Sequence, residues 1–378
     1  MHLLVLRFSA MGDVALMAPV LGALARRYSH ARMTVVTRKE YEPFFFNIPG
    51  AEVIGLNLRD KRYRGLRGVF RLYKELRRLG PFDFGIDLHG SVRSRLIRLF
   101  FGKKIPFALI VKGRKEKRLQ IKHKNKVLFQ LPHVVERYMH VFERAGLSAD
   151  TGPGPWITPQ TQSRKLARDF LIQRGIDKKE SLWIGLAPFA GHGPKTYPFE
   201  RIKDLVRLID YYLPCKLFLF GGGSKEIQQL QELIELAPGK SVMVAGNLSI
   251  EGEIGLMDRL DTMIAMDSFN MHMAALLGRP VLSIWGSTHP FSGFGPFGQD
   301  DRNIVQIPVE LLDCRPCSIF GNKGCYRGDL ACMNWIEPSD VFAGLYRILG
   351  RTLPKPIAER RTVLSQFSAD GVLLNQSQ

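Results

Sequence analysis

The stretch MIAMDSFNMHMAALLGRPVLSIWGSTHP, residues 263–290, decides the fold class of this chain. It begins with a short apolar run that ends at Asp267, and a helical stretch follows until Gly278 stops it. A second buried strand is expected over 281–285. A strand, a helix and a strand at this spacing form a βαβ unit, and such units build parallel sheets. Ligands of parallel sheets bind at the carboxyl ends of the strands, so Asp267 and the hydroxyls of 287–288 are expected at one ligand-binding rim.

The start of the helix in this unit has the features of a phosphate site. The first N–H groups of a helix have no partner inside it, and Ser268 adds a small hydroxyl. The alternative is an ordinary turn in which Ser268 caps the helix. Neither a P-loop nor a dinucleotide fingerprint occurs in the sequence. The local pattern leaves both interpretations open.

Apolar strands alternate with amphipathic helices on both sides of a Pro- and Gly-rich linker, ADTGPGPWITP at 149–159. This alternation predicts an α/β protein with parallel sheets. The expected strands span 3–6, 33–36, 53–56, 82–88, 182–187, 216–220 and 241–244, in addition to the two in the opening stretch. We expect two lobes with a ligand cleft between them. They are an N-terminal lobe over 1–152 and a C-terminal lobe over 153–350, followed by a mobile tail over 351–378.

The composition is that of a soluble globular protein, with 45% hydrophobic residues in a chain of 378. No apolar run approaches the roughly 20 residues that a transmembrane helix needs. The run at 3–6 ends at Arg7, which is not the layout of a signal peptide. Five cysteines, an odd count, argue against a disulfide framework. We therefore expect a cytoplasmic location.

The net charge of +19 is concentrated in one block of the N-terminal lobe. Between Arg59 and Lys126 there are 22 Lys and Arg against 5 Asp and Glu, a net charge of +17. Such a local concentration of positive charge predicts an anionic partner. Nucleic acid, anionic lipid and a phosphorylated glycolipid all qualify. A merely solvated surface is the alternative, although acids would then be expected among the bases.

Five motifs in order carry a resemblance to a known family. They are RFSAMGDVALMAPVL at 7–21, DLHGSVRS at 87–94, APFAGHGPKTYP at 187–198, FGGGSKE at 220–226, and the opening stretch. Together they resemble the bacterial heptosyltransferases of lipopolysaccharide core synthesis, glycosyltransferase family 9, from residue 1 to about 345. The resemblance implies a GT-B fold of two Rossmann-like lobes. It also implies that the N-terminal lobe binds the acceptor and the C-terminal lobe binds ADP-L-glycero-D-manno-heptose.

The implied reaction inverts the anomeric centre without a metal ion. It needs a base for the acceptor hydroxyl, and cations or N–H dipoles for the leaving diphosphate. A second carboxylic acid is not needed, because a diphosphate leaves unprotonated, unlike the sugar oxygen in glycoside hydrolysis. Asp13 matches the family's catalytic aspartate. The alternative for Asp13 on the local sequence is a helix-capping role.

The donor candidates are Lys195, Glu226, Asp267, Ser268, Asn270 and His272, and Lys195 matches the phosphate-binding lysine of the family. Ser268 and Asn270 would hold phosphate oxygens, and Asp267 could bind sugar hydroxyls or cap the helix. Lys195 lies in a Gly- and Pro-rich loop, where a flexible cation can reach a phosphate, or be merely solvated. Glu226 could accept hydrogen bonds from ribose hydroxyls. Alternatively, it is an acidic residue in the first turn of a helix, where the helix dipole favours a negative charge. His272 could equally be a core residue. Phe269 stands where the family usually has Gly, so its ring is expected to pack on the nucleotide or on the helix.

The expected acceptor residues are His89, Ser91 and Arg93, which follow a strand end. A solvated helix face is the alternative for the arginine. The basic block would then meet acceptor phosphates and an anionic membrane surface.

The cysteines Cys314, Cys317, Cys325 and Cys332 form C-x2-C-x7-C-x6-C. This cluster could hold a structural zinc ion or remain as thiols, and we expect no catalytic role for it. Cys215 is expected in the core. No cofactor is expected to be required for the reaction.

The sequence thus predicts an inverting, metal-independent transferase that moves heptose from ADP-heptose to a lipopolysaccharide inner-core acceptor. Its expected location is the inner face of the cytoplasmic membrane, as a peripheral protein. Two alternatives stay open. One is a GT-B transferase that uses another nucleotide sugar or acceptor. The other is a non-enzymatic nucleic-acid-binding protein, although the aromatic residues of the basic block fall at core-like spacing and no nucleic-acid partner is expected.

Overall fold

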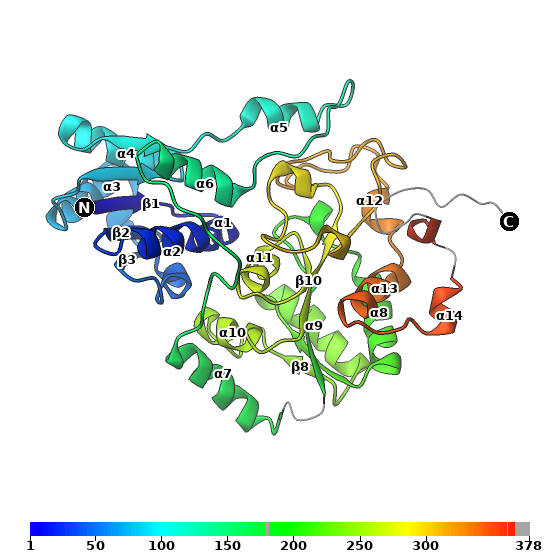
Figure 1. The fold of residues 1–378 in the computed structure, drawn as a ribbon. Helices are drawn as coiled ribbons and strands as arrows, with labels where there is room; N and C mark the ends of the chain where they lie inside the picture. Colours follow the sequence, from blue (N-terminus) through cyan, green and yellow to red (C-terminus); the bar gives the residue numbers. More distant parts are fainter. Residues whose placement is uncertain (178–180, 361, 367–378) are drawn as a thin grey trace. The chain divides into compact units, whose positions relative to one another are not determined.

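The computed structural model describes residues 1–177, 181–360 and 362–366 (Figure 1). The chain divides into two compact units. The first contains Met1–Gly113 and Pro132–Gln160, and the second contains Arg114–Leu131 and Thr161–Gln378. This division differs from the sequence-based one in two respects. The boundary lies after Gln160 rather than near residue 152, and the segment Arg114–Leu131, expected in the first lobe, belongs to the second unit.

The first unit is built on a parallel sheet of five strands in the order β3-β2-β1-β4-β5. The strands are β1 (His2–Leu6), β2 (Arg32–Arg38), β3 (Ala51–Leu56), β4 (Phe84–Asp87) and β5 (Phe107–Leu109). β1 is central because Leu3–Leu6 is apolar on both faces and almost wholly buried, as a strand covered on both sides must be. In register, Val5 faces Val35 on one side and Ile86 on the other.

The helices of the first unit follow the strands in the expected alternation. They are α1 (Met11–Ala15), α2 (Ala18–Arg27), α3 (Gly65–Arg78), α4 (Val92–Phe101) and α6 (Val134–Glu143). α3 and α4 pack beside one another and bury Leu72, Leu76 and Ile97 with the β1 residues Leu4 and Leu6.

The second unit is built on a parallel sheet of six strands in the order β11-β10-β9-β6-β7-β8. The strands are β6 (Leu182–Ala187), β7 (Cys215–Leu219), β8 (Ser241–Met243), β9 (Thr262–Met266), β10 (Val281–Trp285) and β11 (Ile304–Gln306). Its helices are α5 (Arg114–Gln120), α7 (Thr161–Gln173), α8 (Phe199–Tyr212), α9 (Ser224–Leu236), α10 (Ile250–Met257), α11 (Phe269–Leu276), α12 (Ala331–Asn334), α13 (Pro338–Ile348) and α14 (Lys355–Ala358). The predicted βαβ unit is β9–α11–β10, with Ile264 paired to Leu282. The predicted α/β class with two parallel sheets is confirmed.

The end of the chain only partly matches the predicted mobile tail over 351–378. α14 packs on the second unit through Ile357, which is buried. Thr362 donates a hydrogen bond to Asp340, on α13. The first part of this region is therefore folded, because it supplies apolar side chains to the core. Residue 361 and residues 367–378 lie outside the described residues.

Among the residues that the structure describes, no helix combines the length and the apolar character needed to cross a bilayer.

Candidate functional site

Three side chains meet at the carboxyl ends of neighbouring strands in the second unit. Lys195, in the 3₁₀ turn η4 (Gly193–Lys195), follows β6, and its Nζ lies 2.9 Å from Oδ2 of Asp267 at the end of β9. Thr288, after β10, donates to the same Oδ2 at 2.9 Å. The Lys195 and Asp267 side chains are only 14% and 10% exposed. β6, β9 and β10 are adjacent in the sheet, so the fold brings Asp267 and Thr288 to one rim, as predicted, and places Lys195 beside them.

Two hydroxyl groups at this rim are buried without a hydrogen-bond partner within the described part of the chain. They are Oγ of Ser268, which precedes α11, and Oγ of Ser287. Ser268 occupies the N-cap position, but its side chain makes no capping hydrogen bond, so this part of the capping interpretation is wrong. A buried hydroxyl without a partner is costly, and a ligand with acceptor oxygens would remove that cost. With the N–H groups of the first turn of α11, the rim has the donors that a phosphate requires.

The loop at 286–288 is held by Arg315, a residue that no pattern in the sequence indicates. Its guanidinium is buried and donates to the carbonyl of Gly286 at 2.7 Å, to that of Thr288 at 3.1 Å, and to that of Ile307. Burial lowers the pKa of Arg315 to about 10. The guanidinium therefore fixes the backbone that presents Thr288 to Asp267. An arginine between two cysteines gave no sign of this role, because its acceptors are carbonyl groups far along the chain.

Gly321 lies against the stem of Lys195 and was also missed from the sequence. A Cβ atom at Gly321 would lie 2.2 Å from Cγ and Cδ of Lys195, and the glycine has a φ of +74°. Only glycine adopts that conformation readily and leaves this space free. The segment at 321 therefore guides the lysine side chain toward Asp267.

Replacing Gly321 by Ala should weaken binding of a nucleotide diphosphate sugar by about tenfold, because the methyl group must displace Lys195. Gly324→Ala is the matched control in the same loop, since a Cβ there meets no atom within 4 Å. Isothermal titration calorimetry measures both variants. Equal donor affinity in the two variants would show that the packing of Gly321 does not position Lys195.

The remaining donor candidates lie on the same sheet edge. Glu226, in the first turn of α9, accepts from the N–H of Gly222 at 2.7 Å and so orders the glycine run. His272 is buried within α11, as the core interpretation allows, while Asn270 is partly exposed in its first turn. Phe269 begins α11 and is partly exposed.

Asp13 lies in the first unit, on α1, next to a buried arginine. Nη2 of Arg7 is 2.7 Å from Oδ2 of Asp13, and the Asp13 side chain remains 23% exposed. The N–H of Ala10 approaches the same oxygen at 3.4 Å, so the helix-capping role is present together with the ion pair. Tyr138 donates to the backbone carbonyl of Asp13 at 3.0 Å. Burial lowers the pKa of Arg7, but Tyr138 and Asp13 outweigh this, so the pKa is raised and Arg7 stays charged.

His89 lies close to this pair, after β4. Its Nε2 is 3.3 Å from Oγ of Ser9, and Asp87 accepts from the N–H groups of His89 and Gly90 at 3.0 and 2.8 Å. Burial lowers the pKa of His89 to about 4, with further lowering by Arg7 and Lys112. His89 is therefore neutral at pH 7, and its ring can exchange hydrogen bonds with a sugar hydroxyl but carries no charge for a phosphate.

The pKa shift of His89 predicts a loss of stability in acid. The unfolded state takes up a proton below about pH 6.5 and the folded state only near pH 4, so the free energy of unfolding falls as the pH decreases between these values. His89→Gln should make this fall shallower, while His30→Gln, at an exposed position, should not. Urea unfolding at several pH values measures both, and identical slopes for His89→Gln and the wild type would contradict the assignment.

The other acceptor candidates are engaged in the protein's own structure. Ser91 caps α4, since its Oγ accepts from the N–H of Ser94 at 3.3 Å. Nη2 of Arg93 donates to the carbonyl of Tyr63 at 3.2 Å, and burial lowers its pKa. The solvated-face interpretation of Arg93 is therefore wrong, because the side chain links α4 to the turn before α3.

The cysteine cluster is not arranged as a metal site. Within 1–177, 181–360 and 362–366, no group of three or more His, Cys, Asp or Glu side chains is placed to hold a metal ion. Cys332 is buried, and burial raises the pKa of its thiol to about 12. Cys215 is a core residue, as predicted.

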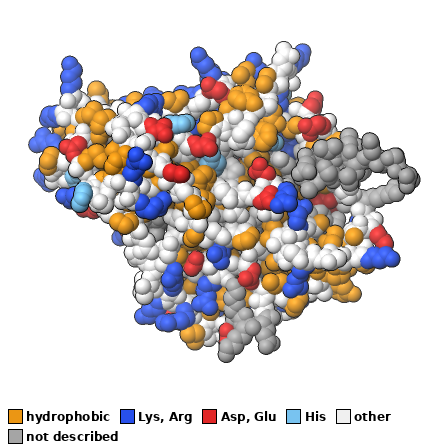
Figure 2. Space-filling view, in the orientation of Figure 1, with side chains coloured by type: hydrophobic (Ala, Val, Ile, Leu, Met, Phe, Trp, Pro, Cys, Tyr) orange, Lys and Arg blue, Asp and Glu red, His pale blue; other side chains and the backbone are white. Residues whose placement is uncertain are grey.

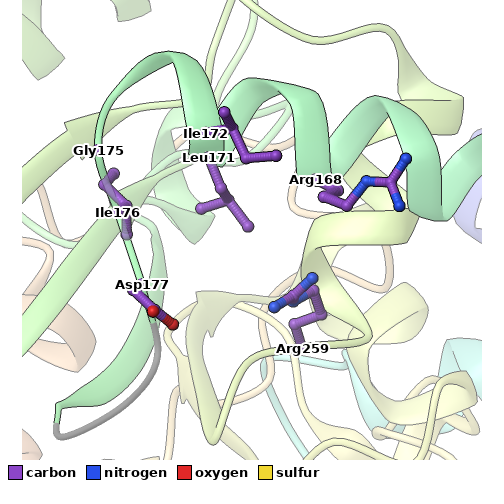
Figure 3. A pocket seen from close by; sticks show the side chains of 7 residues that line it. All are labelled: Arg168, Leu171, Ile172, Gly175, Ile176, Asp177 and Arg259. Carbon is purple, nitrogen blue, oxygen red and sulfur yellow. The ribbon is translucent and has the colours of Figure 1, made fainter.

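A pocket in the second unit lies away from these residues (Figure 3). It is lined by Arg168, Leu171, Ile172, Gly175, Ile176, Asp177 and Arg259. These residues belong to α7 and to segments that precede β6 and β9, and therefore lie near the amino ends of those strands. The pocket contains none of the predicted site residues.

Two parallel Rossmann-like sheets, one with an Arg–Asp pair and one with a Lys–Asp pair beside a helix N-terminus, have the architecture of the GT-B fold. Residues 69–317 match the model of glycosyltransferase family 9 (heptosyltransferase). The chain belongs to this family, and it is a glycosyltransferase.

One curated relative and two solved structures illustrate the similarity in sequence and in fold. The chain is 26% identical to lipopolysaccharide heptosyltransferase 2 of Escherichia coli over 307 residues, which cover 77% of this chain and 84% of that protein. A family 9 glycosyltransferase from Veillonella parvula has a similar fold, with a TM-score of 0.72, 18% identity, and coverage of 92% of this chain and 97% of that one. Escherichia coli heptosyltransferase WaaC, solved with ADP-2-deoxy-2-fluoro heptose, gives a TM-score of 0.62 at 18% identity, covering 92% and 99%.

Proposed function

We propose that this protein transfers heptose from ADP-heptose to a phosphorylated inner-core acceptor of lipopolysaccharide, with inversion and without a metal ion. The observation that carries the proposal is the rim of the second unit, where the Lys195–Asp267 pair lies beside hydroxyls that lack a partner within the described residues. Such a rim suits a diphosphate with a sugar attached. The name of a relative solved with an ADP-heptose analogue supports the same donor.

The chemistry follows from the two charged pairs. Asp13 takes the proton of the acceptor hydroxyl while that oxygen attacks C1 of the heptose. The bond between C1 and the phosphate oxygen breaks, its electron pair leaves with ADP, and a single displacement inverts C1. Lys195, Ser268 and the N-terminus of α11 meet the charge that develops on the diphosphate, which is the task that a divalent cation performs in other transferases.

Asp267 has two candidate partners during the reaction. It holds Lys195 before the donor binds, and Thr288 keeps its Oδ2 in place. When the phosphates attract Lys195, Asp267 can accept from a heptose hydroxyl instead. The protein is proposed to act at the inner face of the cytoplasmic membrane, where such an acceptor would be found.

The experiment that tests this function measures heptose transfer by mass spectrometry, with ADP-heptose and a deacylated lipid A–Kdo acceptor. We expect a product heavier by one heptose, formed equally well with EDTA. Thermal stabilisation by a panel of nucleotide sugars tests the donor in the same preparation, because a ligand that binds only the folded state raises Tm. Transfer or stabilisation by another nucleotide sugar alone would replace ADP-heptose as the donor, and loss of activity in EDTA would exclude the metal-independent reaction.

A further inference from the structure

The paired helices α3 and α4 of the first unit expose large apolar side chains. On α3, Leu66 is 61% exposed and Phe70 is 41% exposed. On α4, Val92 is 74% exposed and Leu99 is 71% exposed. Single exposed apolar residues need no explanation, but these four side chains lie on two helices that pack against each other. The rings of Phe70 on α3 and Phe100 on α4 are in contact, with 5.1 Å between their centroids. They form one exposed apolar surface across the helix pair.

Basic side chains surround this surface. The exposed ones on the two helices and the turn after α4 are Arg67, Arg71, Lys74, Arg77, Arg78, Arg95, Lys103 and Lys104. In Figure 2, hydrophobic side chains lie among Lys and Arg over the region of α3 and α4. The ammonium group of Lys74 is 4.9 Å from the ring centroid of Phe70, so charge and apolar area are in direct contact. Glu75, the one acid of α3, accepts a hydrogen bond from the hydroxyl of Tyr63.

Exposed apolar side chains beside basic ones fit an anionic bilayer better than they fit a nucleic acid. A nucleic acid would be met by cations and by aromatic stacking, which do not require leucine and valine side chains in solvent. An anionic membrane interface uses both features, since the apolar residues enter the boundary of the acyl chains and the basic residues stay among the headgroups. The basic charge requires an anionic partner, and the exposed apolar side chains beside it select anionic lipid over nucleic acid.

The position of the helix pair suits delivery of an acceptor. α3 and α4 begin after the carboxyl ends of β3 and β4, and the loop after β4 holds His89. In a parallel sheet, the helix N-termini thus lie at the same edge as the strand ends. The bond from Arg93 to the carbonyl of Tyr63 joins the two helix starts at this edge. A headgroup presented there would be close to the rim that carries His89 and Asp13.

The basic segment after Gly113 has a different role. Lys117 is buried, with its Nζ 4.3 Å from the ring centroid of Phe294. Lys126 donates to the carbonyl of Asp313 at 2.7 Å, and Gln120 accepts from Ser292 at 2.8 Å. These contacts attach α5 and the following loop to the second unit. The basic block of the sequence therefore separates into a surface on α3 and α4 and a segment whose bases partly serve packing.

We infer that the exposed face of α3 and α4 docks the protein on an anionic lipid bilayer. Leu66, Phe70 and Leu99 insert at the interface, and the surrounding Arg and Lys side chains bind the headgroups. The inference deepens the proposed function and rests on it for the idea that the acceptor is membrane-borne.

The test is cosedimentation with vesicles of phosphatidylcholine that contain about one quarter phosphatidylglycerol, at low and at physiological salt. The apolar variant is Leu66→Ser with Leu99→Ser, and the charge variant is Arg67→Gln, Arg71→Gln and Lys74→Gln. The charge-matched control replaces exposed bases of the second unit, Lys115→Gln, Arg118→Gln and Lys122→Gln. We expect each docking variant to lose about tenfold or more in vesicle affinity, and the control to stay within about twofold of the wild type.

Several results would overturn the inference. The inference fails if the docking variants bind vesicles with the affinity of the wild type. It also fails if the control variant loses as much vesicle affinity as the docking variants. A charge variant that binds vesicles normally but loses binding to duplex DNA would make the surface a nucleic-acid site. A wild-type dimer that the apolar variant dissociates would show that a second copy covers the face.

The proposed function is tested separately with the same proteins. Turnover on a deacylated, soluble acceptor should be unchanged in both docking variants, while KM for a vesicle-borne acceptor should rise. If neither the wild type nor any variant transfers heptose, but the docking variants lose vesicle affinity as expected, the docking surface is supported and the proposed function is wrong. If heptose transfer occurs but substitutions on α3 and α4 leave vesicle affinity unchanged, only the docking inference fails.

Discussion

Replacing Asp13 by Asn should reduce turnover by between about 10² and 10⁴ and leave the affinity for ADP-heptose nearly intact. The amide keeps the shape of the side chain but cannot accept the proton of the acceptor hydroxyl. The bond from Tyr138 goes to the backbone carbonyl of residue 13, so the position of α1 should survive the change. Single-turnover kinetics gives the rate, and calorimetry gives the donor affinity.

The matched control for this change is Asp83→Asn in the same unit. Asp83 accepts from the N–H of His2 at 2.6 Å, near the amino end of β1 and therefore at the other edge of the sheet from Asp13. It should retain turnover. More than about half of the wild-type rate in Asp13→Asn would show that Asp13 is not the base.

Replacing Lys195 by Ala should weaken donor binding and slow transfer together, by about 10² to 10³ in kcat/KM. The ammonium group meets ground-state phosphates, and the charge near it grows as the bond to ADP breaks. The loss also leaves Asp267 in a largely buried place with Thr288 but without its cation. The effect should therefore appear in both the dissociation constant of the donor and the single-turnover rate.

Lys203→Ala is the corresponding control, because Lys203 is also paired in the second unit, with Glu200 at 2.9 Å and Glu232 at 2.7 Å on the surface of α8 and α9. It should bind and turn over the donor as the wild type does. Unchanged single-turnover kinetics in Lys195→Ala would remove this lysine from the donor site.

The sequence predicted the fold and part of the site where polar residues directly follow a clear pattern of apolar residues. The stretch 263–290 predicted β9–α11–β10 because its apolar runs and Gly278 mark the elements directly. Asp267 and Thr288 could be placed on one rim because strand ends in a parallel sheet share an edge.

Other features depend on contacts between distant residues and could not be found in this way. In the sequence, Arg7 only marks the end of an apolar run, whereas the structure pairs it with Asp13 across the loop between β1 and α1. Arg315 has its acceptors in two other loops, so no local pattern reveals it. The segment Arg114–Leu131 is basic like the residues before it, and only the packing of Gln120 and Lys117 shows that it belongs to the second unit.

Heptose transfer is tested most directly by the release of ADP from ADP-heptose in the presence of the deacylated lipid A–Kdo acceptor. We expect one ADP for each heptose transferred, release that requires the acceptor, and loss of that release in Asp13→Asn. Release that continues at the same rate without an acceptor, or that survives the removal of both Asp13 and Lys195, would show that the protein does not transfer heptose by this mechanism.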